Sequence, residues 1–275
     1  MNAGTAGSNP ALSAISAGPG FEQTNMNMDL FFEIHSGLPR EGPGDDASTR
    51  KAFGMVSLLP GPSKILDIGC GPGMQTLELA RLSGGRVIGL DFHLPFLRRL
   101  KESAAAAGLS GRIRCIGGSM ADLCFRAAAF DLIWAEGSIY IMGFEKGLGT
   151  WRRHLKPGGH IAVTEVSWLK PDPPAELKEF WEAGYPAIQD IESNLQAIRG
   201  CGLEPVGHFV LPESAWWDHY YRPLEERVAL LRRKYADRPD ALEMLDAETL
   251  EISLYRSYAS WYGYVFYIMK DPASG

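Results

Sequence analysis

Apolar and polar positions follow two different periods along the middle of the chain. Runs such as KILDI at 64–68 and FDLIWA at 130–135 are apolar almost throughout, which is typical of strands buried on both faces of a parallel sheet. The strands expected on this basis are Lys64–Ile68, Arg86–Leu90, Arg112–Ile116, Phe130–Trp134 and His160–Val166. Helical spacing of apolar residues predicts helices at Gln75–Leu82, Pro95–Ala107 and Glu145–Leu155. This alternation predicts an α/β fold with a doubly wound, mostly parallel sheet and helices on both faces.

The flanking regions predict further elements. Two helices and a loop are expected over 29–59, ahead of the first strand. In the later chain we expect helices at Pro174–Gly184 and Ile191–Arg199 and a strand at Gly207–Leu211. We then expect a long helical region at Pro223–Trp261, broken at Arg238-Pro239, and a last strand at Gly263–Lys270. The aromatic run SAWWDHYY at 214–221 is interpreted as extended, so that Asp218 and His219 would point to opposite faces.

The domain organisation follows from composition. Residues 1–22, rich in Gly, Ser, Ala and Pro, read as a flexible leader without the basic start and apolar core of a secretion signal. Residues 23–275 are expected to form one domain with N-terminal helices at 23–60 and a helical insertion at 223–261. The insertion lies within the 263 − 211 − 1 = 51 residues between the last two strands, which is too long for a structureless loop.

Charge and cysteine spacing exclude several classes of protein. With 275 residues, 45% of them hydrophobic, the chain can bury a sizeable core. A formal net charge of -6 argues against a nucleic-acid partner, and no apolar run is long enough to span a membrane. The four cysteines have no metal-binding or disulfide-framework spacing, so we expect no metal site and a reducing, cytoplasmic location.

A glycine-rich loop follows the first expected strand in the sequence LDIGCGPGMQTLELA at 66–80. An acid, Asp91, ends the next strand, 91 − 73 = 18 residues beyond the last glycine of the loop. This arrangement is typical of adenosine-type cofactors, because a carboxylate can accept both ribose hydroxyls. NAD is disfavoured, because the third small residue of its fingerprint falls on Met74 and Asp67 would repel a pyrophosphate. An ammonium group could be held by Asp67, which favours S-adenosylmethionine.

The chain resembles the class I S-adenosylmethionine-dependent methyltransferases. Their first motif, D-x-G-x-G-x-G, is matched by Asp67, Gly69, Gly71 and Gly73. The resemblance continues over about residues 60 to 170 with LD at 90–91, GSMADL at 118–123, FDLIWA at 130–135 and LKPGGHIAV at 155–163. It implies a seven-stranded Rossmann-like sheet whose last strand, here GYVFYIMK, is antiparallel.

The resemblance also implies a cofactor site. The three motif glycines would let the backbone approach the methionyl part of S-adenosylmethionine, Asp67 would help to hold its amino group, and Asp91 would bind the ribose. Phe92 and Met120 would sandwich the adenine, although both residue types also fill ordinary cores. Ser119 stands where many members have an acid that binds the adenine amino group, and its hydroxyl can still accept that hydrogen bond.

Candidate residues for the methyl acceptor follow the strand FDLIWA, because ligands of such sheets lie beyond the carboxyl ends of the strands. Glu136 could orient the acceptor or accept a proton, and Tyr140 could donate a hydrogen bond or offer an aromatic face. The alternatives are a helix N-terminal interaction for Glu136 and plain packing for Tyr140. His219 is a further candidate general base.

These observations predict a methyltransferase that moves a methyl group from S-adenosylmethionine to a small-molecule acceptor. A protein methyltransferase and a non-catalytic S-adenosylmethionine-binding interaction protein are the alternatives. The helical insertion is expected to pack with the helices around Phe31–His35 as a cap over the acceptor pocket, or else to serve assembly, for example in a homodimer. The sequence specifies neither the acceptor nor its methylated atom.

Overall fold

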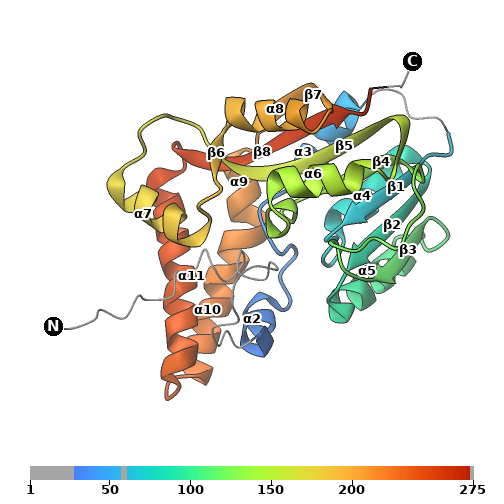
Figure 1. Cartoon of the computed structure of the whole chain (residues 1–275). Helices are drawn as coiled ribbons and strands as arrows, with labels where there is room; N and C mark the ends of the chain where they lie inside the picture. The colour runs from blue at the N-terminus through green and yellow to red at the C-terminus, as the bar shows by residue number, and fades with distance from the viewer. Residues whose placement is uncertain (1–27, 57–60, 273–275) are drawn as a thin grey trace.

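The computed structural model describes residues 28–56 and 61–272, and within them one sheet contains eight strands (Figure 1). The strands are β1 (Lys64–Ile68), β2 (Arg86–Asp91), β3 (Ile113–Gly117), β4 (Phe130–Ala135), β5 (Leu155–Trp168), β6 (Gln189–Asp190), β7 (Glu204–Val210) and β8 (Tyr262–Lys270). They lie in the order β3-β2-β1-β4-β5-β8-β7, with the short β6 paired to β5. The first five strands pair in parallel, whereas β8 is antiparallel to both β5 and β7. This confirms the predicted Rossmann-like sheet with an antiparallel last strand.

Helices cover both faces of the sheet. One face carries α3 (Asp46–Met55), α4 (Met74–Ser83) and α5 (Leu94–Ala106), and the other carries α6 (Phe144–Arg152) and α8 (Ile191–Gly200). Their apolar residues, such as Leu79 of α4 and Trp151 of α6, pack against strands whose residues are almost all buried. The core is therefore formed on both faces of the central strands, as their continuous apolar runs predict.

A separate group of helices, which we call the helical layer, packs at the carboxyl end of β5 (Figure 1). It consists of α2 (Met28–His35), α7 (Ala175–Gly184), η2 (Trp217–Tyr221), α10 (Arg222–Lys234) and α11 (Pro239–Tyr258). Leu30 and Ile34 of α2 share one apolar cluster with Val228 of α10 and Ile252 of α11. The N-terminal helix and the helical insertion therefore pack together, as expected from the sequence.

The interpretation of SAWWDHYY as extended was wrong. Glu213–Trp216 form the short helix α9, and the π-helical turn η2 continues directly into α10. Trp216, Tyr220, Tyr221 and Leu224 are buried, which is the spacing of one helix face rather than of a strand. Asp218 and His219 are thus neighbours on a helical turn.

Two boundaries also differ from the prediction. The helix expected at Glu145–Leu155 ends at Arg152, and β5 begins at Leu155 instead of His160. Leu155 pairs with Phe130 and His160 pairs with Leu132, with an irregularity between the two pairs. The segment KPGG is therefore accommodated as a bulge within the strand.

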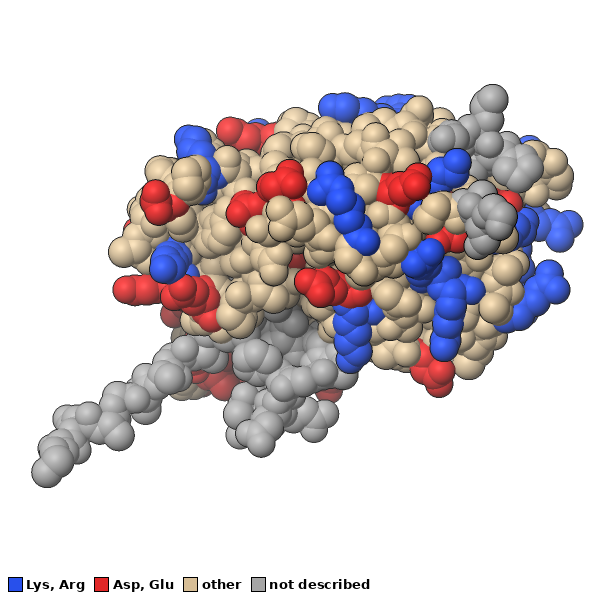
Figure 2. Space-filling model, turned by 45° about the horizontal axis from the view of Figure 1, so that its top comes forward, with Lys and Arg blue, Asp and Glu red and all other residues tan. Residues whose placement is uncertain are grey.

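The surface of the molecule carries charged residues of both signs. Figure 2 shows basic and acidic side chains interspersed over one face of the molecule. None of the helices in the described ranges is both long and apolar enough to cross a membrane. Among the same residues, no group of three or more His, Cys, Asp or Glu side chains is placed to hold a metal ion. The leader predicted at 1–22 lies outside the described residues.

Candidate active site

The loop between β1 and α4 contains three glycines, all in the left-handed region of backbone conformation. Their φ angles are +68° at Gly69, +52° at Gly71 and +90° at Gly73. A Cβ atom on Gly73 would lie 2.2 Å from Cδ1 of Leu100, and one on Gly69 would lie 2.5 Å from Cβ of Ser138. A Cβ on Gly71 would meet its nearest neighbour, Cγ of Glu41, only at 3.5 Å. Gly69 and Gly73 are thus required by packing as well as by φ, whereas Gly71 borders open space.

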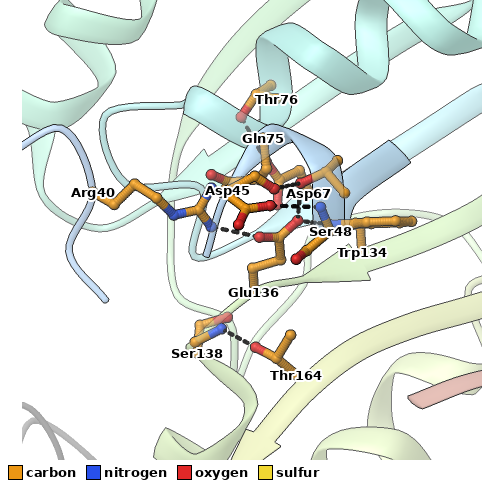
Figure 3. Close-up of polar contacts among 12 residues, drawn as sticks. Arg40, Asp45, Ser48, Asp67, Gln75, Thr76, Trp134, Glu136, Ser138 and Thr164 are labelled. Carbon is orange, nitrogen blue, oxygen red and sulfur yellow. Dashed lines mark hydrogen bonds and ion pairs between the residues drawn. The ribbon is translucent and has the colours of Figure 1, made fainter. Parts of the chain in front are cut away.

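Asp67 lies at the base of this loop, fully buried at the end of β1. Its Oδ2 accepts a hydrogen bond of 2.6 Å from the Thr76 hydroxyl, and its Oδ1 has no hydrogen-bond partner (Figure 3). Burial raises the pKa of this carboxyl to about 7. Because an unpaired buried carboxylate oxygen is costly, Asp67 is suited to receive a cationic hydrogen-bond donor.

Asp91 closes the loop from the neighbouring strand. Its Oδ2 accepts the backbone N–H of Gly71 at 2.9 Å, and its Oδ1 accepts the N–H of His93 at 2.8 Å. Burial raises the pKa of the carboxyl, against the opposing effect of these amide donors. Each carboxylate oxygen has a further lone pair, so Asp91 can accept ribose hydroxyls at the loop.

The residues expected at the adenine follow β2 and β3, which pair Asp91 with Gly117. Phe92 leaves 55% of its surface exposed, so it is not part of the core. Met120 is half-buried and contacts the core, and its backbone carbonyl accepts a hydrogen bond from the Trp151 indole. Ser119 is exposed, and its hydroxyl accepts the N–H of Ala121. Phe92 and Met120 are therefore placed at the ends of adjacent strands.

A cavity lies over the glycine loop and is bordered by the segment between α2 and α3. The residues that line it are Pro39, Arg40, Glu41, Gly42, Gly69, Cys70, Gly71, Pro72, Met74, Gln75, Glu136 and Gly137. The contribution of Arg40 and Glu41 was not predicted from the sequence, where this stretch reads as a turn. Burial raises the pKa of the Glu41 carboxyl to about 7. These two side chains add opposite charges to the cavity wall.

Glu136 is buried at the cavity wall and accepts hydrogen bonds from three side chains. Arg40 Nη2 donates to its Oε2 at 2.5 Å, and the Thr49 hydroxyl and the Trp134 indole donate to its Oε1 at 2.7 and 2.9 Å (Figure 3). A carboxylate with this many donors is held rigidly. Glu136 therefore ties the segment before α3 to the end of β4.

A second polar group lies where the helical layer meets the sheet. Glu165 of β5 is 2% exposed, and burial raises the pKa of its carboxyl to about 8. Neither Glu165 Oε2 nor the Tyr185 hydroxyl has a hydrogen-bond partner. Tyr140, in the turn η1 (Ile139–Ile141), places its ring centroid 6.2 Å from that of Tyr185. The sequence did not single out Glu165, although it is an acid within an otherwise apolar strand.

His219 is half-buried in η2, and no residue of η2 lines the cavity over the glycine loop. His35, by contrast, approaches a residue of that cavity wall, Glu41. Its Nε2 lies 3.3 Å from Glu248 of α11, and its Nδ1 lies 3.9 Å from Glu41. Burial lowers the pKa of His35, but Glu248, Glu41 and Glu251 raise it more, so that it lies above the usual value.

Comparison with known proteins agrees with this geometry. A family profile described as "Methyltransferase domain" matches residues 65–159. The 27-O-demethylrifamycin SV methyltransferase of Amycolatopsis mediterranei is 26% identical over 246 residues, which cover 83% of this chain and 85% of that protein. A sterol 24-C-methyltransferase of Neurospora crassa is 30% identical over 155 residues, which cover 53% of this chain and 40% of that protein. The chain thus spans about two fifths of the length of this relative.

Solved structures share the fold over most of the chain. An S-adenosylmethionine-dependent methyltransferase from Geobacter sulfurreducens, in complex with S-adenosylhomocysteine, has a TM-score of 0.75 at 20% identity, covering 88% of this chain and 97% of that one. The [4+2]-cyclase SpnF has a TM-score of 0.69 at 24% identity, covering 90% and 93%. At these identities the likeness concerns the fold.

The motif glycines, the two loop acids, the strand order and the family match agree with one another. Residues 65–159 match a methyltransferase domain, the chain has the fold of S-adenosylmethionine-dependent methyltransferases, and S-adenosylmethionine is the cofactor of that domain. The unpaired Oδ1 of Asp67 and the open space at Gly71 fit the methionyl end of this cofactor.

Proposed function

We propose that this protein transfers a methyl group from S-adenosylmethionine to a small-molecule acceptor. The observation that carries the proposal is that the helical layer packs at the carboxyl end of β5 and that the segment following its helix α2 lines the cavity over the glycine loop. An acceptor would have to fit beneath this layer, which favours a small molecule over a folded protein substrate. The named relatives support this proposal, because they methylate a rifamycin precursor and sterols.

The residues of the chain would act mainly by position. Bound S-adenosylmethionine supplies an electrophilic methyl group on a sulfonium, and an oriented acceptor can take it with little acid or base assistance. The loop residues Gly71 and Asp91 would fix the cofactor, and the helical layer would exclude water from the methyl group. Of the three candidate catalytic residues, Glu136 would act through the cavity wall that it holds together.

Tyr140 is proposed to donate a hydrogen bond to the acceptor. Burial raises its pKa, so the hydroxyl keeps its proton and acts as a donor rather than a base at neutral pH. Glu165, close to Tyr140 and with an unpaired oxygen, is a second candidate proton acceptor beside His219, but only in its ionised form, because burial raises its pKa to about 8. Comparing the turnover of His219→Gln with that of Glu165→Gln discriminates between them, because only the residue that takes the proton should reduce turnover strongly.

The proposal is tested in two stages. Isothermal titration with S-adenosylmethionine and S-adenosylhomocysteine measures cofactor binding, and transfer of a labelled methyl group is then measured against panels of small molecules and of peptides. Transfer to a small molecule supports the proposal, and transfer to peptides alone supports the protein methyltransferase alternative. Cofactor binding without transfer to either panel supports the non-catalytic alternative. Sedimentation of the same protein tests whether it forms a homodimer.

A further inference from the structure

Arg40 lines the cavity, and one half of its guanidinium group has no hydrogen-bond partner. Nη2 donates to Glu136, whereas Nη1 is buried and makes no hydrogen bond. The whole side chain is only 5% exposed. An unpaired, buried and permanently charged donor is rare and costly, so a ligand that accepts from it is expected.

Several contacts hold Arg40 in this orientation. Glu136, its partner, is itself fixed by Thr49 and Trp134. The following segment is anchored by a hydrogen bond of 2.9 Å from the N–H of Gly44 to the carbonyl of Ala215. Gly44 also passes so close to the guanidinium that a Cβ there would lie 2.5 Å from Arg40 Nη2. These contacts therefore fix the guanidinium group in the orientation needed to bind a ligand.

The other charges around the cavity are negative. Glu41 and Glu136 line it, and Asp67 lies behind the glycine loop with its own unpaired Oδ1. Among the described residues that line the cavity, Arg40 is the single Lys or Arg. A carboxylate entering this cavity would be repelled unless Arg40 bound it. An unpaired cationic donor in the cavity wall and an unpaired carboxylate oxygen behind the adjoining glycine loop match the two charges of a zwitterion.

We infer that Arg40 binds the α-carboxylate of the methionyl group of S-adenosylmethionine through Nη1, and that Glu136 is the positioning residue that holds Arg40 for this contact. The ammonium of the same zwitterion then faces Asp67. The inference rests on the assigned cofactor and adds a residue from outside the glycine motif. It also gives Glu136 a role in cofactor affinity instead of direct contact with the acceptor.

The test compares two ligands that differ in the carboxylate alone: S-adenosylhomocysteine and its decarboxylated analogue, S-adenosyl-3-thiopropylamine. Titration calorimetry of the wild type should show tighter binding of S-adenosylhomocysteine. Arg40→Met should lower the affinity for S-adenosylhomocysteine about 10- to 100-fold and leave that for the analogue nearly unchanged. Arg50→Met is the matched control, because Arg50 is an exposed arginine of α3 that pairs with Glu78 outside the cavity lining.

Two further variants separate recognition from folding. Arg40→Lys keeps the positive charge and should retain part of the preference for the carboxylate. Glu136→Gln should reduce the preference for the ligand with the carboxylate without abolishing binding of the analogue. If Glu136 served the fold alone, the affinities for both ligands would fall equally. Equal losses for both ligands in Arg40→Met and Arg40→Lys, or a wild type without preference, would overturn the inference while the cofactor assignment stands. A wild type that binds neither ligand would overturn both.

Discussion

The carboxylate of Asp91 accepts the backbone N–H of Gly71 at 2.9 Å, so the acid that ends β2 fixes the glycine loop that follows β1. One residue therefore has two tasks, closing the loop and offering acceptor sites to the ribose. Because a hydrogen bond within the protein closes the loop, part of the ordering of the cofactor site does not depend on contacts with the cofactor. This preorganisation lowers the entropic cost of binding.

Asp91→Ala should weaken binding of S-adenosylmethionine by about 1 to 3 kcal/mol, because a charge-assisted acceptor for the ribose is lost. It should also lower the free energy of unfolding without cofactor, since the amides of Gly71 and His93 lose their acceptor. Calorimetry and chemical denaturation measure the two effects. Asp246→Ala, at an exposed acid paired with Arg232, serves as the control. Unchanged affinity in Asp91→Ala would remove Asp91 from the site.

Gly71 and Gly73 should respond differently to the same change. Gly73→Ala places a Cβ 2.2 Å from Leu100 at a φ of +90°, so it should reduce the free energy of unfolding by roughly 1 to 3 kcal/mol or more. Gly71→Ala shares the strain of a positive φ but has room for the methyl group, so it should lose less stability and mainly reduce cofactor affinity, since the methyl group occupies the cavity. Denaturation without cofactor and titration with S-adenosylhomocysteine distinguish the two. A larger loss of stability in Gly71→Ala than in Gly73→Ala would contradict this assignment.

The elements that the sequence predicted best are those with local signals. The strands from Lys64 to Val166 are continuous apolar runs, and the loop acids and glycines stand within a short distance of the strands that present them. Arg40 and Glu136, by contrast, are separated by 96 residues in the chain and meet only because the segment before α3 folds against the end of β4. No local pattern marks such a contact.

The helical layer shows a second limit. Adjacent aromatic residues in SAWWDHYY suggested a strand, but the burial of Trp216, Tyr220 and Leu224 depends on packing against α2 and α11. Helical spacing was present in the sequence, since Trp216, Tyr220 and Leu224 stand four residues apart. Glu165 was missed for a related reason. One acid in an apolar strand becomes a candidate site residue only when the residues that surround it in the folded structure are known.

The affinity for S-adenosylmethionine should rise with pH up to about 7. Burial raises the pKa of Asp67 to about 7, and only the ionised carboxylate can pair with the ammonium, so binding releases a proton below that pH. Titration calorimetry from pH 6 to 8 in buffers of different ionisation enthalpy measures the affinity and the proton release. Asp67→Asn should lose this dependence. Glu41→Gln is the necessary comparison, because the Glu41 carboxyl at the same cavity titrates in the same range.

Glu165 should make the free energy of unfolding of the cofactor-free protein fall as the pH rises, whereas the cofactor affinity that depends on Asp67 should rise. The pKa of Glu165 is raised from 4.5 to about 8 in the folded chain, so the unfolded chain gives up this proton at lower pH. The contribution of Glu165 to the free energy of unfolding therefore falls as the pH rises from about 5 to about 8. Glu165→Gln, measured by chemical denaturation, should flatten that part of the profile and be more stable than the wild type at pH 8. Parallel profiles for the two proteins would show that Glu165 is not buried as an acid.

The pair formed by His35 and Glu248 should make the docking of α2 on α11 dependent on pH. Both side chains are buried, and the pKa of His35 is raised above its usual 6.5 because the effects of Glu248, Glu41 and Glu251 outweigh that of burial. The stabilising contribution of the protonated pair is therefore complete below pH 6.5 and lost as the pH rises through the raised pKa. His35→Gln should thus differ most from the wild type in free energy of unfolding at low pH, and the difference should shrink above the raised pKa. His208→Gln, at an exposed histidine of β7, should show no such trend. A constant difference between His35→Gln and the wild type from pH 5 to 9 would mean that the histidine is neutral in the fold, and that α2 is held to the helical layer by apolar packing alone.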